Sequence, residues 1–223
     1  VELIHNATLL HDDVIDNSNI RRGIKTSNNI EGSLVDASSF ENVESFMKIA
    51  SNRFERIDAI INCVGSLILK PAHLTSEEEL LETMKINLFS SFSIIKYGIK
   101  YLRNTGGSMI FFSSSAASVG LSNHEAIASA KGAIESLVTS AASTYAKYNI
   151  RFNSISPGLV KTNLTKRITE NDVSYDYSRK LHALKRIGSP NNFIPIINCL
   201  LDQDSDWITG QNFKVDGGLS NLK

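Results

Sequence analysis

Short apolar runs alternate with long amphipathic stretches over most of this chain, and this alternation is the feature that most restricts how it can fold. Four runs have β-strand character: residues 57–62, 107–114, 150–156 and 212–215. Two long stretches between them have the apolar spacing of helices: residues 76–103 and 125–148. Strands that alternate with helices favour the α/β class, with a doubly wound parallel sheet covered by helices on both faces.

The region before residue 57 divides near residue 30, where the composition changes. Residues 1–16 have helical apolar spacing, and a polar stretch without an apolar period follows them to residue 29. Beyond this point a short buried strand is expected at 33–36, followed by an amphipathic helix at 39–54. We therefore expect two units: residues 1–30 and residues 31–223.

The composition is that of an ordinary soluble protein, with 42% hydrophobic and 21% charged residues. The 23 basic residues equal the 23 acidic ones, so no net charge indicates a nucleic acid or an anionic membrane as partner. No apolar run reaches the roughly eighteen residues that a membrane span requires. Cys63 and Cys199 lie in apolar runs without disulfide or zinc spacing, so we expect small core residues and a reduced, cytoplasmic setting.

Six short motifs follow one another after residue 31, most of them just past a predicted strand. They are Val35-Asp36-Ala37-Ser38, Asn62-Cys63-Val64-Gly65, Asn87 within a helix, Ser113-Ser114-Ser115, Pro157 to Thr162, and Ile208 to Gln211 followed by Val215 to Gly218. In this order and at these separations they resemble the short-chain dehydrogenase/reductase family. Ligands of an open parallel sheet bind beyond the carboxyl ends of its strands, which is where most of these motifs fall.

The resemblance implies hydride transfer between a small carbonyl or alcohol substrate and NAD or NADP, in a chain that can form homo-oligomers. It implies that Ser114 and Lys131 are catalytic and that Asn87 holds a catalytic water. Cofactor contacts are implied at seven positions: Asp36, Asn62, Lys131, Pro157, Gly158, Val160 and Thr162. The sequence leaves the substrate and the choice between NAD and NADP open.

One position departs from the family pattern where the chemistry needs a proton donor. The family places a tyrosine thirteen residues after the serine and four before the lysine, so that tyrosine and lysine share a helix face. Here that position is Ile127, which can neither donate nor accept a proton. Loss of a positioned general acid typically slows a reaction about 10²–10⁴-fold. His124, three residues earlier, offers an alternative donor.

A second departure concerns the phosphates of the dinucleotide. Family members begin with a strand and a glycine-rich turn at a helix N-terminus, and no such turn precedes residue 36 here. We therefore expect a domain truncated at its N-terminal strands and an oxidoreductase-like chain that is inactive as it stands. The strand at 57–62 then lacks its central partner. Either residues 32–36 pair with it, which we favour, or its edge stays open.

The segment before residue 30 carries a different resemblance. Asp12, Asp13 and Asp16, followed by Arg21-Arg22-Gly23, are similar to the first aspartate-rich motif of trans-polyprenyl diphosphate synthases. By that resemblance the three carboxylates would bind Mg²⁺; otherwise they are a solvated acidic helix end. Three hypotheses remain open: a nicotinamide-dependent oxidoreductase, a non-catalytic remnant or fusion product, and a prenyl diphosphate synthase fragment.

Overall fold

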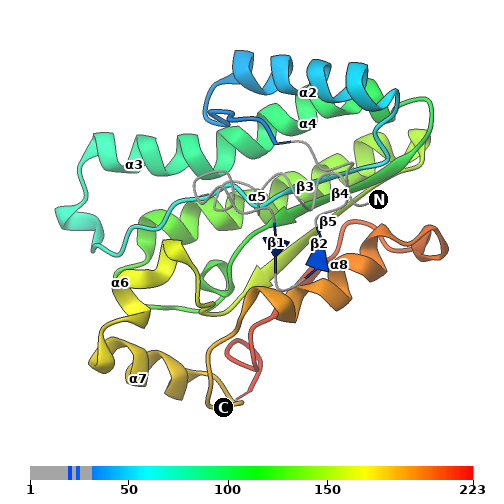
Figure 1. Ribbon diagram of the computed structural model, residues 1–223. Coiled ribbons are helices and arrows are strands. Elements are labelled where there is room, and N and C mark those ends of the chain that lie inside the picture. The colour runs from blue at the N-terminus through cyan, green and yellow to red at the C-terminus, as the bar shows by residue number, and fades with distance from the viewer. Residues whose placement is uncertain (1–19, 22–23, 26–31, 223) are drawn as a thin grey trace.

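A four-stranded parallel sheet forms the centre of the computed structural model, which describes residues 20–21, 24–25 and 32–222 (Figure 1). The strands are β3 (Ala59–Asn62), β4 (Gly107–Phe112), β5 (Ile150–Pro157) and β6 (Asn212–Val215), in the order β3-β4-β5-β6. All three pairings are parallel. The predicted α/β class with a parallel sheet is confirmed, and each of the four predicted strand runs contains a strand.

Helices cover both faces of this sheet. On one face lie α2 (Phe40–Phe54), α4 (Ser90–Leu102) and α5 (Glu125–Tyr145), and on the other lies α8 (Ile194–Leu201) (Figure 1). Alternate strand residues enter the two cores: Ile60 packs in the core that contains α5 residues, and Ile61 in the core that contains α8 residues. Both faces of β4 are buried, which explains its continuous apolar run.

A capping box begins the long helical stretch before β4. The Ser76 hydroxyl accepts a hydrogen bond from the Glu79 backbone N–H, and the Glu79 carboxylate accepts one from the Ser76 N–H. The stretch then runs through α3 (Glu77–Met84), a π-helical turn at Lys85–Phe89, and α4. Such turns are common at functional sites, and this one contains Asn87, a predicted site residue.

The chain between β5 and β6 carries α6 (Lys166–Thr169), α7 (Asp172–Leu181), a 3₁₀ turn at Pro190–Phe193, and α8. Pro195 is the second residue of α8, in the first turn, where a helix tolerates proline because the N–H there has no partner within the helix. Other 3₁₀ turns lie at Ala72–Leu74, Ser115–Ala117, Ala146–Tyr148, Asn163–Thr165 and Gln203–Ser205. None of the described helices is long and apolar enough to cross a membrane.

The segment before α2 differs from the prediction. β1 (Ile20–Arg21) and β2 (Ile24–Lys25) form a short antiparallel pair within the stretch that has no apolar period. The predicted helix at 1–16 lies outside the described residues. The predicted strand at 33–36 is wrong: residues 32–36 form no strand, and Leu34 is 88% exposed. The favoured pairing of this segment with β3 is also wrong, because β4 is the partner that β3 has among the described residues.

The prediction that both cysteines are small core residues is wrong, since Cys63 and Cys199 are exposed. Cys199 belongs to α8, where Ile197 and Leu200 face the core. An apolar neighbourhood in sequence therefore did not determine which side of the helix the thiol occupies. Cys63 follows the last residue of β3, where the chain leaves the sheet.

Candidate functional site

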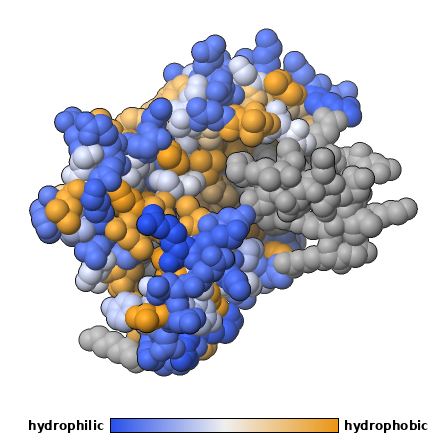
Figure 2. Space-filling model, turned by 60° about the vertical axis from the view of Figure 1, so that its left-hand side comes forward, coloured by the Kyte–Doolittle hydropathy of each residue, from blue (hydrophilic) through white to orange (hydrophobic). Residues whose placement is uncertain are grey.

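A cavity of 2490 Å³ opens at the carboxyl ends of the parallel strands and extends along β3 and α2. The hollow is visible near the middle of the face in Figure 2, with apolar side chains around it. All but one of the site positions predicted after residue 31 line this cavity: Asp36, Asn62, Ser114, Ile127, Lys131, Pro157, Gly158, Val160 and Thr162. The fold thus brings together motifs that lie far apart in the sequence.

Asn62, the last residue of β3, shapes the loop that enters the cavity wall. Its amide nitrogen donates a hydrogen bond to Ser91 Oγ at 3.0 Å, and its Oδ1 accepts one from the Val64 N–H at 3.0 Å. Both polar ends of this buried side chain therefore hold the turn in place. The turn presents Cys63 and Gly65 to the cavity.

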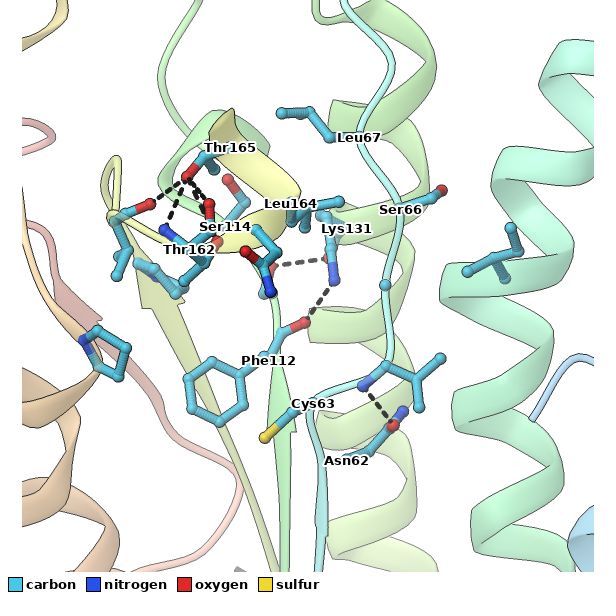
Figure 3. A pocket seen from close by; sticks show the side chains of 18 of the residues that line it. Asn62, Cys63, Ser66, Leu67, Phe112, Ser114, Lys131, Thr162, Leu164 and Thr165 are labelled. Carbon is cyan, nitrogen blue, oxygen red and sulfur yellow. Dashed lines mark hydrogen bonds between the residues drawn. The ribbon is translucent and has the colours of Figure 1, made fainter. Parts of the chain in front are cut away.

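Lys131 extends from α5 into the cavity and is only 8% exposed. Its Nζ donates a hydrogen bond to the Phe112 carbonyl oxygen at 2.8 Å, and Figure 3 shows Ser114 and Thr162 on one side of it and Asn62 and Cys63 below. Burial lowers the pKa of this ammonium from 10.5 to about 8, and the electrostatic interaction with Cys63 opposes this shift. An ammonium has three N–H donors, so two remain for a ligand in the cavity.

Asn87 lies behind the cavity wall and supports the loop that covers it. Its amide nitrogen donates to the Thr83 carbonyl and to Ser66 Oγ, both at 2.9 Å, and its Oδ1 accepts from the Ser66 N–H at 3.2 Å. Gly65 lies close to both side chains: a Cβ there would be 3.0 Å from Asn87 Oδ1 and 3.2 Å from Lys131 Nζ. The absence of a side chain at residue 65 lets this loop lie against the lysine. The catalytic water at Asn87 stays a prediction.

Ser114 differs from the serines on either side of it. Ser113 is buried, with its Oγ 2.8 Å from a Glu135 carboxylate oxygen, and Ser115 is buried, with its Oγ donating to the Asp216 carboxylate at 2.9 Å. Ser114 is partly exposed, and its Oγ accepts the backbone N–H two residues further on. Its own O–H proton is therefore directed to no acceptor among the described residues, so it can serve a ligand.

Ile127 occupies the cavity wall one helical turn before Lys131 and is 3% exposed. Its hydrocarbon side chain supplies no proton at that place. His124 also lines the cavity, and its Nδ1 lies 2.7 Å from the Ser122 carbonyl oxygen. Because a carbonyl oxygen only accepts, Nδ1 carries a proton in this contact, and Nε2 is the ring nitrogen left for a ligand in the cavity.

Two residues that the sequence did not single out hold the site in shape. Thr165 Oγ1 donates to the Val160 carbonyl and accepts from the Thr162 N–H at 3.1 Å, which fixes the loop after β5. The spacing of a capping box between 162 and 165 is the signal that would have revealed it. Glu135 accepts hydrogen bonds from Ser113 at 2.8 Å and Ser156 at 3.0 Å. It lies four residues after Lys131 and therefore on the same face of α5.

Asp36 lies at the exposed rim of the cavity. Its Oδ1 accepts the Ser38 hydroxyl at 2.6 Å and the Ser38 N–H at 2.9 Å, and these hydrogen bonds lower the pKa of the carboxyl. The carboxylate is thus engaged in the turn before α2. Asp12, Asp13 and Asp16 lie outside the described residues. Within the part of the chain that the structure describes, no cluster of His, Cys, Asp or Glu could hold a metal ion.

The residues around Lys131 fit the nicotinamide end of the NAD or NADP that the family resemblance implies. The lysine ammonium and the Ser114 hydroxyl offer hydrogen-bond donors beside a stretch of wall without a side chain at Gly65. A pyrophosphate is usually held by backbone N–H groups at a helix N-terminus. Along this cavity the described residues present no glycine-rich turn at such an N-terminus. The site therefore fits the nicotinamide and its ribose, but its described part lacks the usual donors for the phosphates.

Known families and proteins share sequence similarity with this chain. A family model described as enoyl-(acyl carrier protein) reductase matches residues 10–220. The chain is 33% identical over 193 residues to two proteins of Arabidopsis thaliana, tropinone reductase homolog At2g29260, chloroplastic, and tropinone reductase homolog At5g06060. In both cases the match covers 86% of this chain; it spans 60% of the first relative and 73% of the second. Over 185 residues the chain is 31% identical to the NAD-dependent glycerol dehydrogenase of Listeria innocua, covering 82% of this chain and 72% of that protein.

Solved structures give the same result. The chain superimposes on ElxO with NADP bound with a TM-score of 0.80 at 26% identity, covering 86% of this chain and 78% of that one. It superimposes on a short-chain type dehydrogenase/reductase from Mycobacterium ulcerans with a TM-score of 0.81 at 27% identity, covering 87% and 71%. The family match includes Asp12, Asp13 and Asp16, and nothing in the comparisons supports the similarity of residues 1–30 to polyprenyl synthases.

Proposed function

The chain belongs to the short-chain dehydrogenase/reductase family of NAD(P)-dependent oxidoreductases, and we propose that its cavity is the nicotinamide end of such a site without its proton donor. The observation that carries the proposal is the place of Ile127. It is buried in the cavity wall one turn before Lys131, on the helix face where a proton donor would have to stand.

The remaining groups have clear roles in this proposal. A bound nicotinamide nucleotide would supply the hydride chemistry. The Lys131 ammonium would bind ribose hydroxyls, Ser114 would donate a hydrogen bond to the oxygen of a small alcohol or carbonyl substrate, and Thr162 would border the nicotinamide ring. A carbonyl oxygen that is reduced must also gain a proton, and the isoleucine has none to give. The missing acid corresponds to about 3–5 kcal/mol of activation free energy.

A second candidate is a non-catalytic binding module of the same fold. It is favoured by the groups that survive: Lys131 and Ser114 keep donors directed at the cavity although the acid is absent. A binding module and an inactive reductase differ in whether any nicotinamide nucleotide occupies the cavity. The prenyl synthase hypothesis has no comparable support in the described residues.

A turnover assay tests the proposal. The 223-residue chain is incubated with NADH or NADPH and a panel of cyclic and acyclic ketones, and the loss of reduced nicotinamide is followed. We expect no rate above the blank without protein. The Listeria innocua glycerol dehydrogenase, with NAD and glycerol, is the positive control for the nucleotide and the detection.

Turnover by the unmodified chain that Ser114→Ala abolishes would overturn the proposal. In that case His124→Gln would show whether the histidine at the start of α5 has replaced the missing donor, since His124 also lines the cavity.

A further inference from the structure

The loop Pro157–Thr162, which borders the cavity, is joined to the chain segment 182–188 that follows α7. The Gly188 N–H donates a hydrogen bond to the Leu159 carbonyl oxygen at 2.8 Å, and the Lys161 N–H donates to the Gly188 carbonyl oxygen at 3.0 Å. The helices α6 and α7 lie between these two segments in the sequence. Both ends of this helical insertion are therefore fixed at one place.

His182 adds a side-chain link there and is 2% exposed. Its Nε2 lies 3.1 Å from the Leu159 backbone nitrogen, and its Nδ1 lies 2.8 Å from the Ser178 carbonyl oxygen. A backbone N–H only donates, so Nε2 is the acceptor; a carbonyl only accepts, so Nδ1 carries the proton. The two contacts together require a neutral imidazole in the Nδ1–H tautomer.

The ring lies directly against the turn at Gly158. A Cβ at residue 158 would be 2.6 Å from His182 Nε2 and 3.0 Å from the Asp216 carbonyl oxygen. Any larger residue would push the imidazole away from the Leu159 N–H. Positions 158 and 182 are thus fitted to each other.

We infer that His182 is a positioning residue that couples the last turn of α7 to the turn Pro157-Gly158-Leu159. Ser178 belongs to α7, and Tyr177, Ser178 and Leu181 line the same cavity as that turn. The ring joins α7 to the loop beside the backbone hydrogen bonds of Gly188, so α7 and the loop belong to one wall of the site. The catalytic meaning of the coupling rests on the proposed function, whereas the link itself needs no cofactor.

The experiment compares two substitutions in the full chain by amide hydrogen exchange measured with NMR. His182→Phe keeps a ring of similar size but removes both nitrogens, and His182→Gln keeps one acceptor and one donor. In H182F the Leu159 N–H loses its acceptor, so exchange at Leu159 and in the last turn of α7 should become about tenfold faster or more. H182Q should retain most of the protection. The matched control is His73→Phe on an exposed 3₁₀ turn, which should leave both exchange rates unchanged.

The nitrogen shifts of the His182 ring in the unmodified chain give a second measurement that needs no variant. They should report the neutral Nδ1–H tautomer. An Nε2–H tautomer, unchanged exchange at Leu159 in H182F, or equal exchange in H182Q and H182F would overturn the inference. None of these measurements includes a nicotinamide nucleotide, so a failure of the proposed function leaves them unaffected, and their failure leaves the turnover assay unaffected.

Discussion

Gly65 lies against Lys131 so closely that a Cβ at residue 65 would be 3.2 Å from the lysine Nζ and 3.0 Å from Asn87 Oδ1. Hydrogen bonds restrain both neighbouring side chains. The Lys131 ammonium donates to the Phe112 carbonyl oxygen, and the Asn87 amide is hydrogen-bonded to Ser66. The loop after β3 and the helix α5 therefore fit together through the absence of one side chain.

Gly65→Ala should lower the free energy of unfolding by about 1–3 kcal/mol, the range typical of an overpacked site. The matched control is Gly120→Ala, because a Cβ at residue 120 would have nothing within 4 Å. The control should change stability by less than about 0.5 kcal/mol. Urea unfolding of the three proteins measures both effects, and equal stabilities of the two variants would contradict the tight fit at residue 65.

The buried Lys131 should make stability depend on pH between about 8 and 10.5. Its pKa in the folded chain is about 8, below the ordinary 10.5, so in this range the unfolded chain still holds a proton that the folded chain has released. Stability therefore rises with pH, and the contribution of this lysine improves by about 3 kcal/mol across the window.

The measurement for this prediction is urea unfolding of the unmodified chain and of Lys131→Met at several pH values from about 7.5 to 10.5. Methionine has no proton to release, so the difference in unfolding free energy should shift in favour of the unmodified chain as the pH rises. A difference that stays constant with pH would show that the folded-state pKa of Lys131 is not lowered.

Ile127→Tyr should not by itself create carbonyl reductase activity in this chain. A tyrosine at 127 would share the cavity with Ser114 and Lys131, so the acid would be restored in place. The described residues lack the usual donors for the dinucleotide phosphates, however, and an acid is of no use without a bound hydride donor. Ile127→Phe is the control for ring size. Turnover on a ketone panel by I127Y but not by I127F would contradict this prediction.

NAD(H) and NADP(H) should bind a polypeptide of these 223 residues more weakly than a Kd of ~10 μM, a strength of about 7 kcal/mol. The physical reason is that the described residues along the cavity lack the glycine-rich turn that usually holds the dinucleotide phosphates. Calorimetric titration with each of the four nucleotides measures the affinity. A Kd below ~10 μM for the unmodified chain, together with weaker binding by Lys131→Met, would contradict the prediction, because it would show a complete cofactor site in this chain.

Mg²⁺ should not stabilise this chain. The three carboxylates Asp12, Asp13 and Asp16 form one cluster in sequence, and the described residues provide no second metal-binding cluster. A ligand that binds only the folded chain raises its Tm, so millimolar Mg²⁺ should change the Tm by less than about one degree. A larger rise that Asp13→Asn removes would revive the synthase-like hypothesis for residues 1–30.

The order and type of the elements follow from local sequence. The run at 107–114 contains β4, the stretch at 125–148 contains α5 and the 3₁₀ turn after it, and Ser76 begins α3 with a capping box. Apolar periodicity and caps depend on residues a few positions apart, so they can be recognised without knowing the fold. The convergence of the motifs also follows, because parallel strands end at one edge of the sheet.

The contacts of individual side chains were decided by the tertiary structure. Residues 33–36 have the composition of a buried strand but form none, because a strand is stable only beside a neighbour. The roles of Ser114 and its neighbours also depend on partners elsewhere: Glu135 and Asp216 engage the serines on either side and leave the middle one for the cavity.

His182 is the clearest example of a side chain whose contacts cannot be predicted from its local sequence. Nothing in the residues around it distinguishes it from a surface histidine at the end of a polar helix. Its role comes from the Leu159 N–H, which the fold brings from a different loop, and from Gly158, whose missing Cβ makes room for the ring. Hydrogen bonds between segments distant in sequence leave no local period, so only the assembled chain reveals them.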